Sequence, residues 1–217
     1  MYPPKYFQES LDQESTLVEH KKFLNLIADN PLATLIINNE ELKTNISHIP
    51  FHSTETEKPN ELSELIGHVS KHHPLAKKLI NKSCETINLI FHGEQAYISP
   101  NMLPDKTNNS VPTWNYAKVH ITGQATEITA VEEKYQQMRQ TTEFFEQQQD
   151  TPWLLPETPS KPILQMLNAI CIFKVLIVAV EGRFKLSQNK SADVRAKIAE
   201  QIANQNKPLL AQQIQTF

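Results

Sequence analysis

The sequence predicts a mainly β protein with helices: a closed antiparallel β-barrel surrounded by peripheral helices. Six or more segments alternate apolar and polar residues or form compact apolar runs, and turn signals separate them. The helical segments are not interleaved one per strand, which argues against a doubly wound parallel sheet. A chain of 217 residues can bury one ample core. We therefore expect one domain over residues 1–217, with an N-terminal helix and a C-terminal helical extension from about 190 to 217.

An N-terminal helix is predicted from about Thr16, because Thr16 and Glu19 have the spacing of a capping box. The pair Asn30–Pro31 ends it, since proline cannot continue a helix. Its buried side is expected to hold Leu17, Leu24, Ile27 and Ala28.

Strand signals follow this helix. Residues 32–38 and 44–51 predict a strand pair joined by a polar connection, and residues 61–69 predict a third strand. A short helix is expected from Pro74, which suits a first helical turn. Residues 86–99 predict a β-hairpin that turns near Gly93, because apolar residues recur at period two on its way in.

The clearest strand signal covers residues 116–128, where Val119 and Ile121 face one way and the polar residues between them face the other. A helix is predicted from about Ala130, with Thr129 and Glu132 as a second capping box. It is expected to bury Val131, Tyr135, Met138 and Phe145.

The C-terminal part begins with a short helix in residues 158–169, which leads into an apolar strand over 169–180. Gly182 is expected to turn the chain after that strand. Ser191 caps a last helix. The buried edge of that helix is predicted to be Val194, Ile198 and Ile202.

Several common chemistries have no support in the sequence. The four glycines lie too far apart for a dinucleotide-binding or phosphate-binding loop, and the serine-hydrolase, zinc-protease and CxxC motifs do not occur. His48 and His52 would share one face of a strand and could in principle meet a metal. No carboxylate or thiolate lies at ligand spacing, so isolated hydrogen-bonded imidazoles are the favoured interpretation, and no metal site is predicted.

Charge and hydropathy limit the partners. The net charge is −3 with three arginines, so there is no sign of the basic face that a nucleic-acid-binding protein usually carries. The longest apolar run, residues 169–180, contains Lys174 and is shorter than the roughly 20 residues of a spanning helix. The first ten residues contain two prolines and no apolar core of a secretion signal. No membrane association is expected, and the cytoplasm is the expected location.

A set of short motifs identifies a family resemblance. In order along the chain these are "MYPPKYF", "NPLATL", "HIPF", "GHVSKHHP", "QAYISP", "VPTWNYAKVH", "PW" and "EGRFKLSQN". They resemble the PaiB-type proteins, also called FMN-binding negative transcriptional regulators, over residues 1 to about 200. The resemblance implies the FMN-binding split-barrel fold and a homodimer that holds FMN in the groove between its subunits. "VPTWNY" and "KLSQN" are its most specific parts.

The same resemblance implies a set of flavin-contacting residues and no catalytic side chain. Beside the ring and on the neighbouring strand they are His48, Ile49, Pro50 and Thr34. In the stretch that grips phosphate they are His68 and Lys71. The groove lining and the late strand supply Thr113, Trp114, Asn115, Tyr116, Lys185, Ser187, Gln188 and Asn189. Together they offer the apolar walls, donors, acceptors and cations that a flavin needs. Core or dimer packing is the alternative role for Trp114 and Tyr116, and plain surface charge for Lys71 and Lys185.

The chain also departs from the family pattern. Lys71 stands where relatives commonly carry an arginine, which replaces a planar guanidinium by an ammonium. Ala76 stands in place of a tryptophan, Ile172 in place of a glycine, and Lys174 in place of an acidic residue. These changes affect how well the chain matches the FMN-contacting pattern of the family, and they leave the fold prediction unchanged.

Three functions follow from the resemblance. The first is a homodimeric FMN-binding protein with a regulatory role, for which DNA is a partner by family name alone. The second is an FMN-dependent oxidoreductase on the same scaffold, since flavin carries out hydride chemistry without an obvious protein acid or base. The third is a dimeric interaction module that has lost its cofactor.

Overall fold

A computed structural model describes residues 13–38, 44–53, 63–82, 85–103, 111–156 and 160–216. Its strands form one antiparallel sheet in the order β2-β1-β5-β6-β7-β4-β3. The strands are β1 (Leu32–Asn38), β2 (Thr44–Pro50), β3 (His52–Ser53), β4 (Glu64–Ser70), β5 (Glu85–Ile98), β6 (Thr113–Glu127) and β7 (Ile170–Lys185). The predicted antiparallel fold with peripheral helices is confirmed.

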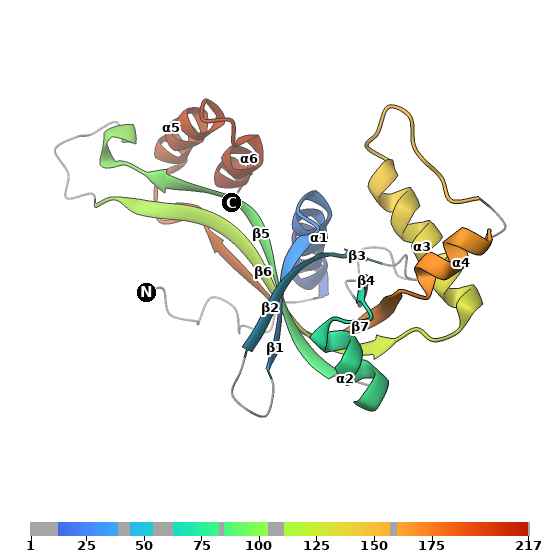
Figure 1. Ribbon diagram of the computed structural model, residues 1–217. Helices are drawn as coiled ribbons and strands as arrows, with labels where there is room; N and C mark the ends of the chain where they lie inside the picture. The colour runs from blue at the N-terminus through green and yellow to red at the C-terminus, as the bar shows by residue number, and fades with distance from the viewer. Residues whose placement is uncertain are drawn as a thin grey trace.

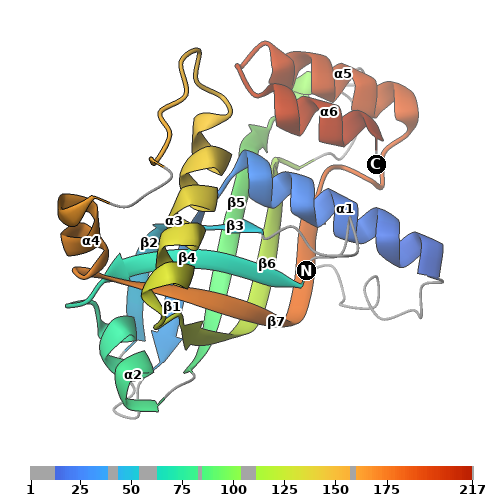
Figure 2. The same cartoon turned by 90° about the vertical axis from the view of Figure 1, so that its right-hand side faces the viewer.

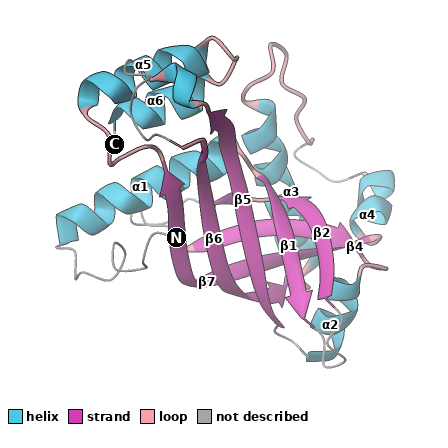
Figure 3. Ribbon diagram, turned by 90° about the vertical axis from the view of Figure 1, so that its left-hand side faces the viewer, coloured by secondary structure: helices cyan, strands magenta, loops and turns pink. Residues whose placement is uncertain are grey.

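The sheet curls because its two outermost strands follow one another in the chain. β2 and β3 lie at opposite ends of the strand order, yet Phe51 alone separates them. Phe51 is fully buried and meets the rings of Phe91 and Phe173 edge-on, at centroid distances of 6.2 and 5.9 Å. β4 crosses the strands β5 and β6, in front of them in Figure 2 and behind them in the opposite view of Figure 3. The result is a half-barrel with an aromatic centre.

Helices close the barrel and add two smaller cores. They are α1 (Gln13–Asp29), α2 (Pro74–Lys82), α3 (Val131–Glu146), α4 (Lys161–Leu167), α5 (Ala192–Ala203), α6 (Pro208–Thr216) and the 3₁₀ turn η2 (Pro100–Met102). α1 packs on the main core, and α5 with α6 covers one end of the long strands (Figure 1). α3 and α4 lie on the other side of the molecule and bury a third cluster.

The predicted hairpin at Gly93 is wrong. β5 runs without interruption from Glu85 to Ile98, and the register against β6 shifts between His92 and Gln95. A side chain at Gly93 would begin 3.0 Å from the carbonyl oxygen of Ala117. The glycine therefore permits a close approach of two strands beside a bulge, and a turn is not its role.

The predicted turn at Gly182 is also wrong, because this glycine too lies inside a continuous strand and permits close packing. β7 continues through it to Lys185. A Cβ at Gly182 would lie 2.4 Å from the ring of Phe23, which stacks on Phe184 with centroids 6.0 Å apart. Gly182 thus makes room for α1 against the sheet.

The helix predictions are confirmed in existence and corrected in detail. α1 begins at Gln13 instead of Thr16; Phe23 and Leu26 are buried, and the predicted Ala28 is exposed. The N-cap residue of α3 is Ala130 and not Thr129, and no side chain makes a capping hydrogen bond there. Ser191 is the N-cap of α5 without a side-chain hydrogen bond. α6 is a further helix after the one predicted to be last.

The remaining differences between the predicted and observed elements are smaller. Val131 is exposed, whereas Tyr135 is buried as predicted. The third strand covers 64–70, and residues 61 and 62 of its predicted span lie outside the described residues, as does the side chain of Leu17.

Candidate functional site: a terminal pocket and a polar sheet face

One pocket lies where β6 and β7 reach α5, and we call it the terminal pocket. Its volume is about 250 Å³. Its lining consists of Ile98, Ser99, Pro100, Leu103, Val111, Thr113, Asn115, Lys185, Ser187, Asn189, Lys190 and Ile198. Five of these residues belong to the predicted flavin-contacting set. The pocket therefore joins the two motifs "VPTWNY" and "KLSQN", which are about 70 residues apart in the chain.

Strand pairing explains why these motifs meet. β6 and β7 are antiparallel neighbours, and Tyr116 pairs with Lys185. Asn115 is completely buried, and its Nδ2–H donates to Oγ of Ser187 at 3.0 Å. The Ser187 hydroxyl also lies 3.2 Å from Oδ1 of Asn115. Each buried polar side chain thus satisfies the other, which fixes both in the pocket wall.

Ser187 has an unusual backbone. Its φ of 61° lies in the left-handed region, which residues other than glycine, asparagine and aspartate seldom occupy. The loop is held by Gln188, whose Nε2–H donates to the carbonyl of Phe184 at 2.8 Å and whose Oε1 accepts from the N–H of Leu186 at 2.8 Å. Backbone strain held in place by surrounding bonds is common at binding sites.

Two lysines give the terminal pocket a positive charge. Lys185 Nζ donates to Oγ1 of Thr113 at 2.6 Å, and Lys190 follows directly after Asn189. None of the described lining residues is acidic. Among the residues that the structure describes, neither lysine has an ion-pair partner.

The alternation of β6 divides the predicted groove lining. Thr113 and Asn115 line the terminal pocket, whereas Trp114 and Tyr116 belong to the opposite face of the strand. Trp114 is 52% exposed and meets Tyr97 edge-on with centroids 6.3 Å apart. This exposed aromatic pair is available for packing against another surface.

A chain of hydrogen bonds runs across the outer face of β2, β1, β5 and β6. Lys118 Nζ lies 3.1 Å from Nδ1 of His92, and Nε2 of His92 lies 2.9 Å from Oγ1 of Thr34. Oγ1 of Thr34 is in turn 3.3 Å from Nδ1 of His48. Because an ammonium can only donate, His92 Nδ1 must accept and Nε2 must carry the proton. We call Lys118, His92, Thr34 and His48 the sheet-face chain.

The neighbourhood of this chain is crowded with basic groups. Burial lowers the pKa of His92, and the positive charges of Lys118, His48 and His120 lower it further. Burial also lowers the pKa of Lys118. The nearby Arg183 is paired with Glu181 at 2.6 Å. These directions agree with a neutral His92 that accepts from Lys118.

His48 and Thr34 are partners across β2 and β1, as the sequence predicted for neighbouring strands. Ile49 is buried in the main core, and Pro50 is half-buried at the end of β2. The metal pair considered for His48 and His52 does not form. His52 is buried, bonds Oγ1 of Thr141 at 2.8 Å and stacks on Phe144, with burial lowering its pKa.

His68 and Lys71 lie elsewhere. His68 is half-buried on β4 opposite Ile172, and burial lowers its pKa. The backbone N–H of Lys71 donates to the carbonyl of Ala169, just before β7 begins. Since Lys185 is the last residue of β7, the two lysines lie at opposite ends of that strand. One chain therefore does not bring the predicted phosphate cations together.

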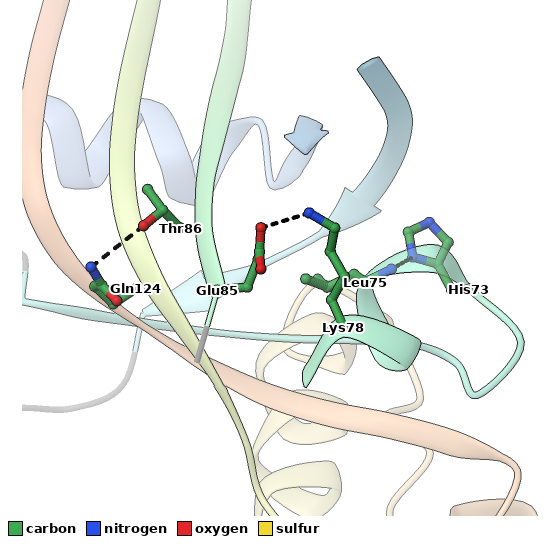
Figure 4. A network of polar contacts seen from close by, with 6 residues as sticks. All are labelled: His73, Leu75, Lys78, Glu85, Thr86 and Gln124. Carbon is green, nitrogen blue, oxygen red and sulfur yellow. Dashed lines mark hydrogen bonds and ion pairs between the residues drawn. The ribbon is translucent and has the colours of Figure 1, made fainter. Parts of the chain in front are cut away.

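α2 is firmly attached beside Lys71. Figure 4 shows the Leu75 N–H donating to Nδ1 of His73 at 3.2 Å and Lys78 Nζ bound to Oε1 of Glu85 at 2.7 Å. Nε2 of His73 lies 2.8 Å from Oγ of Ser47 on β2. His73 therefore links the start of the helix to the sheet, and burial lowers its pKa.

Neither redox nor metal chemistry is indicated elsewhere in the described residues. Cys171 is buried, and burial together with the negative charge of Glu127 raises the pKa of its thiol to about 12, so it is not a reactive thiolate. Within the described ranges, no group of three potential ligands could hold a metal ion. None of the helices in those ranges is long and apolar enough to cross a membrane. Cys84 lies outside the described residues.

Comparison with known proteins assigns the family. Residues 1–207 match the family described as "Putative FMN-binding domain". The chain belongs to this FMN-binding family. Protease synthase and sporulation protein PAI 2 of Bacillus subtilis is 27% identical over 96% of this chain and 92% of its own length. The resemblance to PaiB-type proteins is thereby confirmed, and FMN is the cofactor that family membership assigns.

Solved structures support the fold. The FAD and heme binding protein of Mycobacterium smegmatis superposes with a TM-score of 0.59 at 15% identity, covering 90% of this chain and 78% of that protein. The flavocytochrome Anf3 of Azotobacter vinelandii gives 0.54 at 17% identity, covering 80% and 67%. The predicted split-barrel class is confirmed by these neighbours.

Sequence reasoning missed four polar residues of these two sites. Lys190 and Ser99 line the terminal pocket, and His92 and Lys118 complete the sheet-face chain. Lys190 directly follows "KLSQN" and could have been included with it. His92 and Lys118 occupy outward positions of two alternating strands, which a face-by-face comparison of those strands could have revealed.

Proposed function

We propose that this chain is a homodimeric, cytoplasmic FMN-binding protein with a regulatory role, and that the flavin lies in a groove completed by a second copy. One observation carries the proposal: the two most family-specific motifs line a single cationic pocket. Thr113, Asn115 and Lys185 contribute donors and charge there. All fourteen flavin-contacting residues named from the sequence remain a prediction of this proposal.

The chemistry of the residues suits FMN. Lys185 is a cation for its phosphate, while Thr113 and Asn115 are polar groups for its hydroxyl-bearing chain or ring edge. Trp114 and Tyr97 offer an aromatic wall on the opposite face of β6. FMN would supply hydride or single-electron chemistry when bound. The residues of this chain would bind it, orient it and limit its contact with water.

Size supports a second copy. A volume of about 250 Å³ lies below the roughly 300–1,000 Å³ of pockets that enclose drug-sized ligands. The outer sheet face also leaves Leu32, Ile46 and Trp114 more than half exposed. Covering such side chains is a usual purpose of a homodimer interface. The separation of Lys71 from Lys185 within one chain also supports a groove completed by a second copy.

A regulatory role has narrower support. It comes from the resemblance to PaiB-type regulators, and the relative PAI 2 is named for protease synthesis and sporulation. The net charge of −3 does not favour DNA as the direct partner. The oxidoreductase alternative predicts steady-state oxidation of NADH or NADPH by the FMN-loaded dimer. The proposed regulator predicts no turnover beyond that of free FMN.

FMN titration with parallel measurement of mass tests the proposal. The absorption spectrum of FMN should change and saturate near one flavin per chain, and sedimentation should give a dimer. Lys185→Gln should weaken FMN binding, whereas Lys21→Gln, which changes an exposed lysine on α1, should not. A monomer with an unchanged flavin spectrum would refute the proposed function.

A further inference from the structure

We propose that the terminal pocket is an anion-binding site for a phosphate or carboxylate group, with Lys185 and Lys190 as its cations. Thr113 and Asn115 are its neutral donors, and Ser187 holds Asn115 in place. The inference rests on the proposed function in that the pocket belongs to the proposed flavin groove. It goes further by naming the chemistry of the pocket itself and by adding Lys190, which no family motif includes.

The charge balance is the first argument. Among the described residues, two lysines and no carboxylate line the pocket. An ammonium carries three donors, and Lys185 uses one of them on Thr113 Oγ1. Within the described residues, neither lysine forms an ion pair that would neutralise it. Two like charges at one pocket repel each other, and an anion between them would remove that repulsion.

The donor geometry is the second argument. Because Thr113 Oγ1 accepts from Lys185, its own hydroxyl hydrogen is left to donate. Asn115 is fully buried and spends one amide hydrogen on Ser187, which leaves the other. The pocket thus presents hydroxyl and amide hydrogens beside two cations, the combination that makes charge-assisted bonds to anionic oxygens.

The fixed backbone is the third argument. Ser187 is held at a φ of 61° between Leu186 and Gln188, whose bonds lock the loop. The N–H of Lys190 donates to the carbonyl of Ser187 at 2.9 Å, so the loop that carries Lys190 closes on itself. A preorganised loop loses little freedom when it binds a ligand, which favours tight binding of a small group.

The volume limits the ligand. A volume of about 250 Å³ accommodates a phosphate or a small carboxylate. The apolar side chains of Ile98, Leu103 and Ile198 also line the pocket and would contact a short carbon chain on the ligand. The anion has two sources: the phosphate of FMN itself, or a separate small metabolite that carries a phosphate or carboxylate group. Both sources demand the same lysines.

The test uses the full-length protein and inorganic phosphate. Thermal unfolding is followed in increasing phosphate, with sodium chloride at equal ionic strength as the reference. Phosphate should raise Tm of the wild type more than chloride, because a ligand that binds only the folded state stabilises it. Lys185→Gln and Lys190→Gln should each weaken phosphate binding about tenfold or more. Lys190→Arg should retain binding, and Lys21→Gln, at an exposed position on α1, should behave as the wild type.

The source of the anion follows from competition. If phosphate displaces FMN but not riboflavin, the pocket holds the phosphate of the flavin. If phosphate and FMN bind together, the pocket holds a separate anion; either result supports the site. The proposed site is overturned if phosphate raises Tm no more than chloride does. It is also overturned if phosphate raises Tm equally in all four variants. A normal phosphate response without any flavin binding would overturn the proposed function and leave this inference standing, so the two failures are distinguishable.

Discussion

Lys71 and Lys185 lie at opposite ends of strand β7. Lys71 bonds the residue before the strand, and Lys185 is its last residue, so about 50 Å of extended chain separates them. If both lysines contact one FMN, they must come from different copies. Lys71→Ala and Lys185→Ala should therefore each weaken FMN binding, by roughly 10- to 100-fold for a lost charge-assisted bond. Fluorescence titration of FMN measures the change, and an unaffected dissociation constant for either variant would remove that lysine from the site.

Stability should fall as the pH drops below about 6.5, the ordinary histidine value. The pKa values of His52, His68, His73, His92 and His120 are all lowered, chiefly by burial. The unfolded chain then binds more protons than the folded one between the lowered pKa values and about 6.5. The stabilisation is complete above that range and is lost as the pH falls through it. Tm measured between pH 8 and pH 5 should decrease, and a flat profile would contradict these shifts.

His73 is expected to contribute to this pH dependence through a specific bond. Its Nδ1 accepts the N–H of Leu75 at the start of α2, and protonation would remove that acceptor. His73→Ala should lower the free energy of unfolding by about 1 kcal/mol, the cost of a lost cap. The matched control is His72→Ala, an exposed neighbour. Equal Tm values for the two variants would contradict the capping role.

The sheet-face chain makes a prediction about His92. The positive charge of Lys118 is one cause of the lowered pKa of His92, and the Lys118 ammonium donates to the neutral ring. Lys118→Gln should therefore raise the pKa of His92, though not to the ordinary value, because burial is the larger cause. Nuclear magnetic resonance titration of the imidazole measures this. A pKa that stays constant or falls would show that the chain of hydrogen bonds does not form in solution.

Gly182 tests the packing of α1 on the sheet. A methyl group there would begin 2.4 Å from the ring of Phe23, in a layer where Phe23 and Phe184 stack. Gly182→Ala should destabilise the protein by about 1–3 kcal/mol through overpacking. Ala179→Ser changes an exposed position of the same strand and should cost little. Chemical denaturation compares the two, and a neutral Gly182→Ala would show that α1 can shift freely.

The sequence allowed correct prediction of those elements whose local signals agree with their environment. The alternation around Val119 and Ile121 and the proline at position 74 each led to the observed strand or helix. Gly93 and Gly182 misled because a glycine that permits close packing and one that permits a turn look alike in a single sequence. Only the tertiary contacts with Ala117 and Phe23 distinguish the two roles.

The site was predictable in part for a related reason. The motif pieces that share the terminal pocket were recognised, but their grouping depended on the pairing of β6 with β7, which sequence alone did not show. Trp114 and Asn115 are adjacent in the chain yet face opposite sides. Lys190 and His92 lie outside the motifs, and Lys118 lies inside "VPTWNYAKVH" but was not assigned to the site; the contacts of all three became clear from their spatial neighbours.

The most direct test of the shared flavin groove is complementation between two inactive variants. Lys71→Ala and Lys185→Ala proteins are unfolded together, refolded as a mixture and titrated with FMN. If each groove takes Lys71 from one copy and Lys185 from the other, half the dimers are mixed and one of their two grooves is intact, so about a quarter of the grooves should bind FMN with wild-type affinity. Recovery of no wild-type sites in the refolded mixture, while refolded wild-type protein binds normally, would contradict a flavin site shared between two copies.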